Sequence, residues 1–542
     1  MIKKSIISML LVFGCISRID AQDMQRPKLV IGIVLDQMRW DYLYRYYDRF
    51  GPDGFKRLMK DGFNCERTYI NYLPTFTAPG HSCIYTGSVP AIHGIAANDW
   101  LDIKMKKNVY CTEDKTVQPV GGGKDGLQSP RNLLATTITD ELKLATNFRS
   151  RVYGVAIKDR GAILPAGHAA DGAFWFESAS GKFISSSFYM DHLPEWLNRF
   201  NNRNVTDSLL RLDWHTSFDI ASYNQSTPDL NQYEGTFKYE QQPTFPHHTS
   251  KDAVQNRSGI KTTPQGNTMT RMLAEELILE EGLGKSPETD FLAVSFSSTD
   301  YIGHMYGPNS VEIEDMYIKM DQELALFLKF LDHHVGKGQY TLFLSADHAG
   351  AHNPVFLKDN KIPAGSYSEH ILKKGLKELL GKEYDSNLVM DITNYQVYID
   401  EAMVINKGYD RGQLIAKVKS WLLAQEGISM VIDLQQIGNE AIPQEIKERA
   451  INGYHLTRSG SIQIIMEPGW YHSSWNTGTT HGTWNPYDAH IPLIWYGAGI
   501  PAGKTYRKVY MTDIAPTLAA LLQIQEPNGN IGNVITEIFQ ER

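Results

Sequence analysis

Residues 28–36 read Lys-Leu-Val-Ile-Gly-Ile-Val-Leu-Asp, a continuous apolar run that ends in a carboxylate. A short run of this kind, rich in β-branched residues, is typical of a strand that is covered on both faces of a sheet. Asp36 would then lie at the carboxyl end of a parallel strand, where open α/β sheets bind their ligands. The alternative is that Asp36 only caps a helix over residues 42–58.

Three further runs have the same character, and each leads into polar residues. They are residues 152–157, 291–296 and 340–344, which lead into Lys158, Asp300 and Asp347. Helical periodicity is found in residues 134–145, 268–281 and 313–327, and a last strand and helix are expected at 491–495 and 512–522. This alternation predicts an α/β fold with a doubly wound, largely parallel central sheet and helices on both faces. With Asp36, four polar side chains would meet at one edge of the sheet.

The rest of the chain is expected to lie outside this sheet. Residues 101–130 are rich in Lys and Gly, and residues 165–265 are polar, aromatic and poorly periodic. Both are interpreted as inserts, and the second as a cap, because compact domains rarely carry structureless loops of such length. Residues 370–475 have strand and helix signals of their own and predict a smaller α+β lobe. We therefore expect residues 22–542 to form one domain with these inserts.

Residues 1–21 have the parts of a secretory signal peptide: two lysines, the apolar run 6–14 and a small-residue cleavage site. The run is too short to span a bilayer, and no later run reaches about 18 apolar residues, so no transmembrane segment is expected. We expect a periplasmic or secreted protein. Lipoprotein anchoring at Cys15 is not expected, because Phe13 is bulky for that motif.

The chain is acidic. Its formal charge is −8 at pH 7, and residues 1–21 carry a net +2, so residues 22–542 carry about −8 − 2 = −10. No general affinity for nucleic acid is expected of such a chain. An anionic substrate would need locally concentrated positive charge, which metal ions can provide.

Three cysteines follow residue 21, at wide spacing. They make neither a disulfide framework nor a thiolate zinc cluster. A single bridge between Cys65 and Cys111 stays open as an alternative in an oxidising compartment, with Cys83 buried in a helix.

Residues 77–80, Thr-Ala-Pro-Gly, read as the start of a helix, with a hydroxyl at or near the N-cap and a proline in the first turn. The unpaired N–H groups and the helix dipole make such an end a ready anion site. Thr77 would be the hydroxyl best placed to meet the anion. The alternative is an ordinary capped helix.

Six metal-binding side chains complete the pattern: Asp36, Asp300, His304, Asp347, His348 and His481. The four-residue step from Asp300 to His304 places both side chains on one side of a helical turn. The adjacent Asp347 and His348 can both reach a metal if the backbone turns there. Three carboxylates and three imidazoles suit zinc without thiolates. Taken singly, each residue is equally well explained as a solvated or hydrogen-bonded turn residue.

Several motifs occur in a matching order along nearly the whole chain after residue 21. They are Asp36 after the first strand, Pro74-Thr75-Phe76-Thr77-Ala78-Pro79-Gly80-His81, Tyr85-Thr86-Gly87 onward to His93-Gly94-Ile95 and Asn98, Asp300-x-x-Gly303-His304-x-x-Gly307-Pro308, Ser345-Ala346-Asp347-His348-Ala349 and Thr480-His481-Gly482. Together they resemble the alkaline phosphatase superfamily, and most of all its PafA-type bacterial alkaline phosphatases, which are phosphate-irrepressible and use a threonine nucleophile. The sulfatase branch is not supported, because Cys83 is followed by Ile-Tyr-Thr.

The resemblance implies a site with two zinc ions. Asp300, His304 and His481 would hold one zinc, and Asp36, Asp347 and His348 the other, with Thr77 bound to the second as an alkoxide. Thr77 would attack the phosphoryl group in line, and water would hydrolyse the resulting phosphothreonine. A magnesium requirement is not expected, because no third, magnesium-binding carboxylate set is evident.

The resemblance also implies a phosphate clamp. Lys158-x-Arg160 looks like the monoesterase branch, because two cations suit the dianionic phosphoryl group of a monoester, whereas a diester has a substituent on one of those oxygens. Asn98 would donate to a phosphoryl oxygen. Without the resemblance, Lys158 and Arg160 would read as a solvated strand end.

These features predict an exported, zinc-dependent alkaline phosphatase that releases inorganic phosphate from a broad range of small phosphate monoesters, and we expect a monomer. The first alternative is a phosphodiesterase or nucleotide pyrophosphatase of the same superfamily, which would share the metal ligands and the threonine. The second is a non-catalytic surface protein that binds a polyanion in a metal-stabilised pocket.

Overall fold

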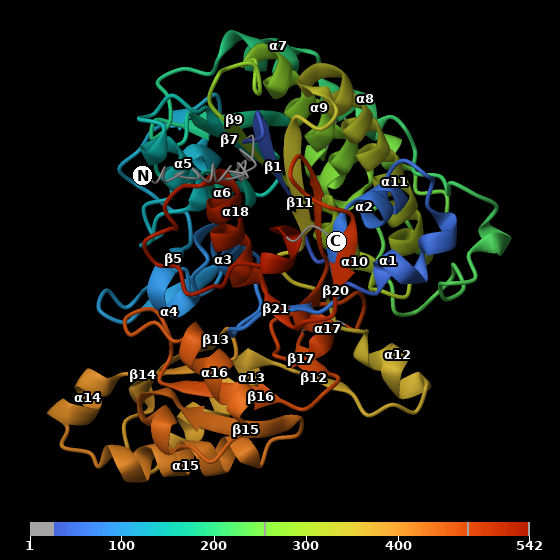
Figure 1. The fold of residues 1–542 in the computed structure, drawn as a ribbon. Helices are drawn as coiled ribbons and strands as arrows, with labels where there is room; N and C mark the ends of the chain where they lie inside the picture. The colour runs from blue at the N-terminus through green and yellow to red at the C-terminus, as the bar shows by residue number, and fades with distance from the viewer. Residues whose placement is uncertain (1–25, 254–255, 474–475, 540–542) are drawn as a thin grey trace, which may run out of the picture.

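A large mixed sheet organises the molecule in the computed structural model, which describes residues 26–253, 256–473 and 476–539 (Figure 1). The predicted signal peptide lies outside these residues. The sheet has ten strands in the order β20-β2-β19-β11-β1-β10-β7-β8-β9-β6. In that order they span Gly503–Thr505, Phe63–Cys65, Leu493–Gly497, Tyr340–Ser345, Leu29–Leu35, Asp290–Phe296, Val152–Ala156, Gly172–Glu177, Lys182–Ser186 and Pro119–Val120.

The five central strands, from β11 to β8, are parallel to one another. Ile31 in β1 lies opposite Leu292 in β10 and Leu342 in β11, and every residue of β1 is buried. The prediction of a doubly wound α/β fold is confirmed. The sheet is less parallel than expected, since β19 and β9 run antiparallel to their neighbours. A short turn joins β8 to β9, and strands joined in this way must be antiparallel.

Helices cover both faces of the sheet (Figure 1). One face carries α3 (Thr77–Thr86), α5 (Ile138–Ala145), α6 (Asp159–Ala166) and α18 (Ile514–Leu522), and the other carries α2 (Phe55–Asp61), α9 (Gln265–Glu280), α10 (Ser298–Tyr306) and α11 (Val311–Leu331). The single helix expected over residues 42–58 is wrong. It is broken into α1 (Tyr42–Arg45), a 3₁₀ turn and α2, because Gly51-Pro52 stops helical hydrogen bonding.

The predicted inserts need correction. Residues 172–186, which the sequence analysis assigned to a cap, form β8 and β9 of the main sheet, because their short apolar runs pair with β7 and with each other. The remainder of the predicted cap contains α7 (Glu195–Asn202), α8 (Val205–Leu210) and irregular chain. Residues 101–130 are partly sheet as well: β4 (Asp99–Asp102) pairs with β5 (Lys107–Tyr110), and β6 joins β9.

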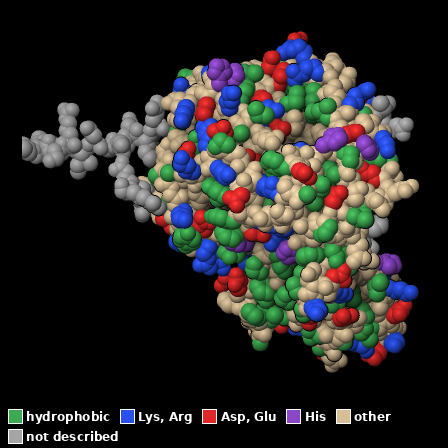
Figure 2. Space-filling model, turned by 90° about the vertical axis from the view of Figure 1, so that its right-hand side faces the viewer, with side chains coloured by type: hydrophobic (Ala, Val, Ile, Leu, Met, Phe, Trp, Pro, Cys, Tyr) green, Lys and Arg blue, Asp and Glu red, His purple; other side chains and the backbone are tan. Residues whose placement is uncertain are grey.

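A second, four-stranded sheet lies below the main sheet in Figure 1, in the order β13-β14-β16-β15. Its strands span Val389–Thr393, Gln396–Ile399, Ile462–Met466 and Ile428–Asp433, and its helices are α13 (Glu369–Leu380), α14 (Glu401–Asn406), α15 (Arg411–Leu423) and α16 (Gln444–Gly453). These elements are termed the lobe here. The strands share an apolar core with α13, α14 and α15, and α16 packs in a second apolar cluster with β15 and β16. On the face in Figure 2, apolar side chains gather over the lobe, while charges of both signs are mixed over the main body.

The remaining elements are short. They are α4 (Pro90–His93), α12 (Pro354–Asp359), α17 (Pro486–Ala489), β3 (Thr68–Tyr69), β12 (Gly365–Tyr367), β17 (Trp470–His472), β18 (His490–Ile491) and β21 (Val509–Tyr510). Within the described ranges, no helix combines the length and the apolar character that a membrane crossing requires.

The three cysteines within the described ranges are not bridged. Cys65, Cys83 and Cys111 are all buried free thiols. The possible bridge between Cys65 and Cys111 is therefore wrong in this structure. The two residues pack in different apolar clusters, Cys65 in the main core and Cys111 in a small cluster with Trp100.

Candidate active site

The site lies at the carboxyl ends of the central strands. Asp36 directly follows β1, Asp347 lies two residues after β11, and Asp300 is the third residue of α10, the helix that follows β10. The three carboxylates are at most 2% exposed. Parallel packing of these strands therefore brings together residues that lie far apart in the sequence.

The three imidazoles share one arrangement. Nδ1 of His304 lies 2.8 Å from the carbonyl of Thr479, Nδ1 of His481 lies 2.7 Å from that of Thr75, and Nδ1 of His348 lies 3.0 Å from that of Ala349. A carbonyl only accepts, so each Nδ1 carries the proton and each Nε2 keeps a lone pair. Metal-ligating histidines are commonly oriented by such a bond at their other ring nitrogen.

Each Nε2 atom faces a carboxylate. That of His304 lies 3.1 Å from Asp300 Oδ1, and that of His481 lies 3.8 Å from the same oxygen. Nε2 of His348 lies 3.5 Å from both Asp36 Oδ1 and Asp347 Oδ2. The side chain of His304 is 36% exposed, whereas that of His481 is 5% exposed, so His304 marks the open side of the site.

These residues fit two metal ions. The potential ligand atoms of Asp300, His304 and His481 all lie within 4.8 Å of one another, as do those of Asp36, Asp300 and His348. Asp36 Oδ1 and Asp347 Oδ2 are buried and have no hydrogen-bond partner among the described residues. An unpaired carboxylate oxygen is costly to bury, and a bound cation removes that cost. One detail differs from the expected ligand sets: Asp300 belongs to both groups, and Asp347 to neither.

Thr77 lies beside this cluster and is 1% exposed. It is the first residue of α3 rather than its N-cap, which is Phe76, and its hydroxyl makes no capping hydrogen bond to the helix. The expected capping hydroxyl is therefore free for another role. Its Oγ1 lies 3.3 Å from His348 Nε2 and 3.4 Å from Lys158 Nζ.

Lys158 lies at the centre of the site, two residues after β7. Its ammonium lies 2.8 Å from Asp36 Oδ2 and 2.6 Å from Asp300 Oδ2. Burial lowers the pKa of Lys158, but the charges of Asp300 and Asp36 raise it by more than burial lowers it. The pKa therefore lies above its ordinary value. The ammonium thus holds positive charge between two carboxylates.

The carboxylates differ in their affinity for a proton. Burial and the nearby charge of Asp347 raise the pKa of Asp36 well above its ordinary value. Burial also raises the pKa of Asp300, but His304 and Lys158 more than offset it, and the resulting pKa is well below the ordinary value. Burial lowers the pKa of His481, so that imidazole stays neutral. Burial likewise lowers the pKa of His348, whereas at His304 burial is outweighed by Asp300, which raises the pKa. Two neutral imidazoles beside crowded carboxylates form a site that favours bound cations.

The predicted phosphate-binding residues approach from the α3 and α6 side. Asn98 Oδ1 accepts a 2.9 Å hydrogen bond from the N–H of Ala78, which leaves its Nδ2 as the donor for a ligand. Arg160 donates through Nη1 to the Tyr110 hydroxyl at 2.9 Å, and its Nε has no partner among the described residues. The structure therefore brings every predicted site residue to one region.

Two buried residues at the site escaped the sequence analysis. Gln37 donates from Nε2 to Asp300 Oδ1 at 2.7 Å and from its backbone to Asp347 Oδ1 at 3.2 Å. His81 contacts Asp347 Oδ2 at 3.3 Å through Nδ1. The four-residue step from Thr77 to His81 could have indicated the second residue, but a lone glutamine after a strand carries no comparable signal.

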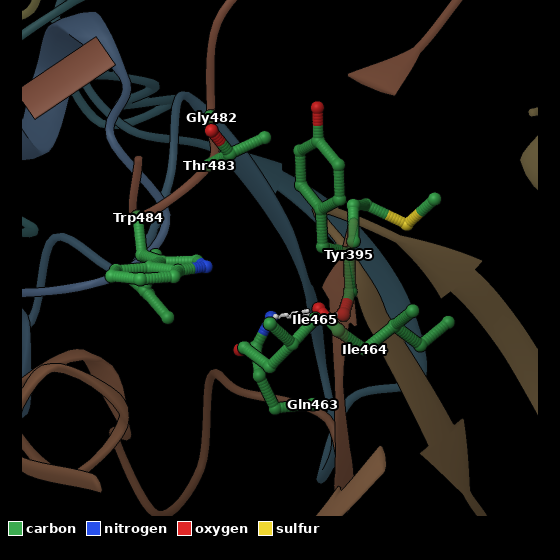
Figure 3. Close-up of a pocket in the computed structure, with 9 residues that line it drawn as sticks. Tyr395, Gln463, Ile464, Ile465, Gly482, Thr483 and Trp484 are labelled. Atoms are coloured by element: carbon green, nitrogen blue, oxygen red, sulfur yellow. Dashed lines mark hydrogen bonds between the residues drawn. The ribbon is translucent and has the colours of Figure 1, made fainter. Parts of the chain in front are cut away.

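The loop that carries His481 packs against the lobe. Figure 3 shows a small cavity between Gly482, Thr483 and Trp484 of this loop and Tyr395, Gln463 and Ile464 of the lobe. The Tyr395 hydroxyl lies 3.3 Å from the carbonyl of His481. The ring of Phe76, next to Thr77, lies edge-on to the ring of His481 at 5.4 Å.

Comparisons with known proteins agree with this geometry. The profile of the type I phosphodiesterase/nucleotide pyrophosphatase family matches residues 30–488. The chain is 49% identical to a Myroides odoratus protein named calcium-transporting ATPase, over 99% of this chain and 100% of that protein. It is 48% identical to alkaline phosphatase PhoV of Synechococcus elongatus, over 96% and 94%.

A third relative also has a solved structure. The chain is 46% identical to alkaline phosphatase PafA of Elizabethkingia meningoseptica, over 99% of each chain. The PafA crystal structure superposes with a TM-score of 0.93, over 95% of this chain and 99% of that one. A second PafA structure carries substitutions at a threonine, an asparagine, a lysine and an arginine. The chain therefore belongs to the type I phosphodiesterase/nucleotide pyrophosphatase family of the alkaline phosphatase superfamily, in its PafA-type branch, and is a phosphoric monoester hydrolase.

Proposed function

We propose that the protein is an exported, zinc-dependent alkaline phosphatase that hydrolyses phosphate monoesters of broad range through a phosphothreonine on Thr77. One observation carries the proposal: three imidazole Nε2 atoms and three buried carboxylates converge beside the Thr77 hydroxyl. The donor set is nitrogen and oxygen only, which suits zinc. No feature of the described residues calls for magnesium.

Two zinc ions would be held by Asp300, His304 and His481 and by Asp36, Asp347 and His348, with Asp300 near both. Bound there, they would supply positive charge to the phosphoryl oxygens and make a hydroxyl or water nucleophilic at mild pH. The residues themselves hold this charge in place, because each imidazole is oriented by a backbone carbonyl.

Thr77 is the proposed nucleophile. Its Oγ1 forms a bond to phosphorus while the bond from phosphorus to the leaving oxygen breaks, and the leaving group departs as an alcohol after taking up a proton. Water then attacks the phosphothreonine, Thr77 Oγ1 regains a proton, and inorganic phosphate is released. The ammonium of Lys158, 3.4 Å from Oγ1, orients the hydroxyl and stabilises negative charge on it.

The clamp formed by Asn98, Lys158 and Arg160 favours monoesters over diesters. Two cations beside the phosphoryl position can bind two nonbridging oxygens of a dianion, whereas a diester offers fewer free charged oxygens. The PafA variant carries changes at the same four residue types as Thr77, Asn98, Lys158 and Arg160, with the same spacing within each pair. This correspondence supports the assignment.

The second candidate is a phosphodiesterase or nucleotide pyrophosphatase. The matched family profile favours it, because that family is named for these activities. The two candidates share the metal ligands and Thr77, and they differ in the role of the clamp. A monoester dianion depends on Lys158 and Arg160, and a diester monoanion depends on them much less.

Export to the periplasm or the medium is proposed from the signal-like residues 1–21, and a monomeric state is proposed with it. Both are testable by fractionation of cells and by light scattering of the purified protein. A cytoplasmic location of the full-length chain would overturn the first, and a dimer mass the second.

The decisive experiment combines zinc analysis with kinetics on an aryl phosphate monoester and a bis-aryl phosphate. We expect about two zinc ions per chain and faster turnover of the monoester. Thr77→Ala should abolish both activities, and Arg160→Ala should lower monoester kcat/KM by 10-fold or more, by about 1.4 kcal/mol or more. Faster turnover of the diester, unaffected by Arg160→Ala, would instead establish the phosphodiesterase.

A further inference from the structure

A third basic residue lies beside the clamp and belongs to no part of the proposed mechanism. Lys261 lies in the 3₁₀ segment Arg257–Thr262, which comes from the polar region before α9. Its ammonium lies 5.7 Å from the centroid of the Tyr301 ring, and the ammonium of Lys158 lies 5.1 Å from the same centroid. Tyr301 directly follows Asp300 in α10, so Lys261 reaches the edge of the active site from a remote part of the sequence.

The segment that carries Lys261 is firmly held. Ile260 is fully buried, and its carbonyl accepts a 2.9 Å hydrogen bond from the Thr263 hydroxyl. Gly266 follows closely, and a Cβ at this position would lie 2.1 Å from the Ser298 hydroxyl of α10. The backbone of the segment therefore keeps a fixed place against the helix that carries Asp300 and His304.

Lys261 forms no ion pair with a carboxylate among the described residues. No carboxylate among the described residues lies within 4 Å of its ammonium, whereas Lys158 contacts two. Burial lowers the pKa of Lys261; Asp125 and Asp159 raise it, and Arg160 and Lys158 lower it further. Asp159 is already engaged, since its Oδ1 accepts from the Tyr110 hydroxyl at 2.7 Å. A half-buried, unpaired cation beside other cations is costly unless an anion joins them.

We propose that Lys261 is a specificity-determining residue that binds a second anionic group of the substrate, outside the transferred phosphoryl group. The favoured substrates would be monoesters that carry a second negative charge, such as a carboxylate or a further phosphate. This inference rests on the proposed monoesterase function and refines it. The transferred phosphoryl group is not the partner of Lys261, because Lys158 already occupies the position beside Thr77 and Lys261 makes no contact with Thr77, Asp36 or Asp300.

The test uses two substrates that differ in one anion, phenyl phosphate and 4-carboxyphenyl phosphate, on the zinc-loaded enzyme. Lys261→Gln should lower the ratio of their kcat/KM values, carboxylate over neutral, by about fivefold, which is typical of one solvent-accessible charge pair. Lys261→Arg should keep the ratio, because it keeps the charge. Lys251→Gln is the matched control, since Lys251 also lies over a tyrosine, 5.6 Å from the Tyr239 ring, but in a different surrounding.

A failure of the proposed function and a failure of the role of Lys261 give different results. If the wild type hydrolyses neither substrate, the proposed function is wrong. If it hydrolyses both and Lys261→Gln changes them equally or not at all, only the role of Lys261 is wrong. Thermal melts of each variant separate folding defects from binding defects, and Lys261→Met, which removes the charge but keeps an unbranched side chain, takes the place of Lys261→Gln if that variant does not fold.

Discussion

At the scale of single residues, Gln37 shows how much of the site depends on a side chain that binds no substrate. Its backbone adopts the left-handed region with φ 65°, which non-glycine residues rarely occupy. This conformation lets one residue donate to two carboxylates of the proposed metal site, Asp300 and Asp347. Strain of this kind persists only where the surroundings fix it.

Gln37→Met should loosen Asp300 without removing a metal ligand. The side chain keeps its size but loses the 2.7 Å donor bond, and losing such an outer partner typically costs about 10- to 100-fold in metal affinity. We expect zinc to be lost at lower chelator concentrations, and activity to return in excess zinc. Gln444→Met, which removes an exposed hydrogen bond to Glu448, is the control. Unchanged zinc retention in Gln37→Met would show that the amide is dispensable.

The buried imidazole of His93 is expected to lower the stability of the protein in acid. It is fully buried beside Cys83, and burial lowers its pKa to about 3. The folded pKa is below that of the unfolded chain, so the unfolded state binds more protons between these values and stability falls as pH falls from about 6.5 towards 3. The full loss amounts to about 5 kcal/mol.

His93→Gln should therefore reduce the difference between urea midpoints measured at pH 7.5 and at pH 4.5. The exposed His192 serves as the control position, and His192→Gln should leave the difference as it is in the wild type. A difference that is equally large in His93→Gln would assign the acid sensitivity to other groups.

At the scale of elements, α3 is placed by close contact with the loop that carries Asp347 and His348. A Cβ on Gly80 would lie 2.3 Å from the backbone oxygen of Asp347. Only glycine allows this approach, although alanine is the better helix former by about 1 kcal/mol. The contact fixes the distance between Thr77 at the start of α3 and the metal ligands.

Gly80→Ala should therefore lower both activity and stability, the latter by about 1–3 kcal/mol, as expected for overpacking. Urea unfolding and kcat measure the two effects. Gly438→Ala, at a position where an added Cβ has nothing within 4 Å, should change neither. If Gly80→Ala stabilises the protein and keeps its activity, the helix and the loop are not tightly coupled.

The strands and helices differ in how well the sequence predicts them. The runs that became β1, β7, β10 and β11 are buried throughout and mostly apolar, and this pattern depends only on local burial. The strands β8 and β9 were missed, because their short runs lie in a polar region and are recognisable only by their pairing. The broken helix after Asp36 was missed because apolar periodicity outweighed Gly51-Pro52.

At the scale of the whole molecule, convergence at the strand ends was predictable because parallel strands must end at one edge. The contributions of Gln37 and Lys261 were not, since one depends on a rare backbone conformation and the other on the docking of a distant segment. The same holds for the lobe, whose link to the His481 loop is visible only in three dimensions.

The contact between the lobe and the His481 loop is expected to support activity. The Tyr395 hydroxyl donates to the carbonyl of His481 at 3.3 Å and accepts from the N–H of His472 at 3.2 Å, so one lobe residue holds the loop of a proposed metal ligand. Tyr395→Phe removes this bond but keeps the ring in the lobe core. We expect an activity loss of about threefold to tenfold, as for one hydrogen bond of about 1 kcal/mol.

The loss should be reversed by added zinc, because the variant weakens the placing of His481 and leaves the ligand itself intact. Tyr398→Phe is the matched control: Tyr398 lies in β14, three residues after Tyr395, and its hydroxyl donates at 3.1 Å to the carbonyl of Arg458, away from the proposed metal ligands. Equal losses in the two variants, or a loss in Tyr395→Phe that zinc does not restore, would mean that the lobe supports the fold in general and has no particular hold on the metal site.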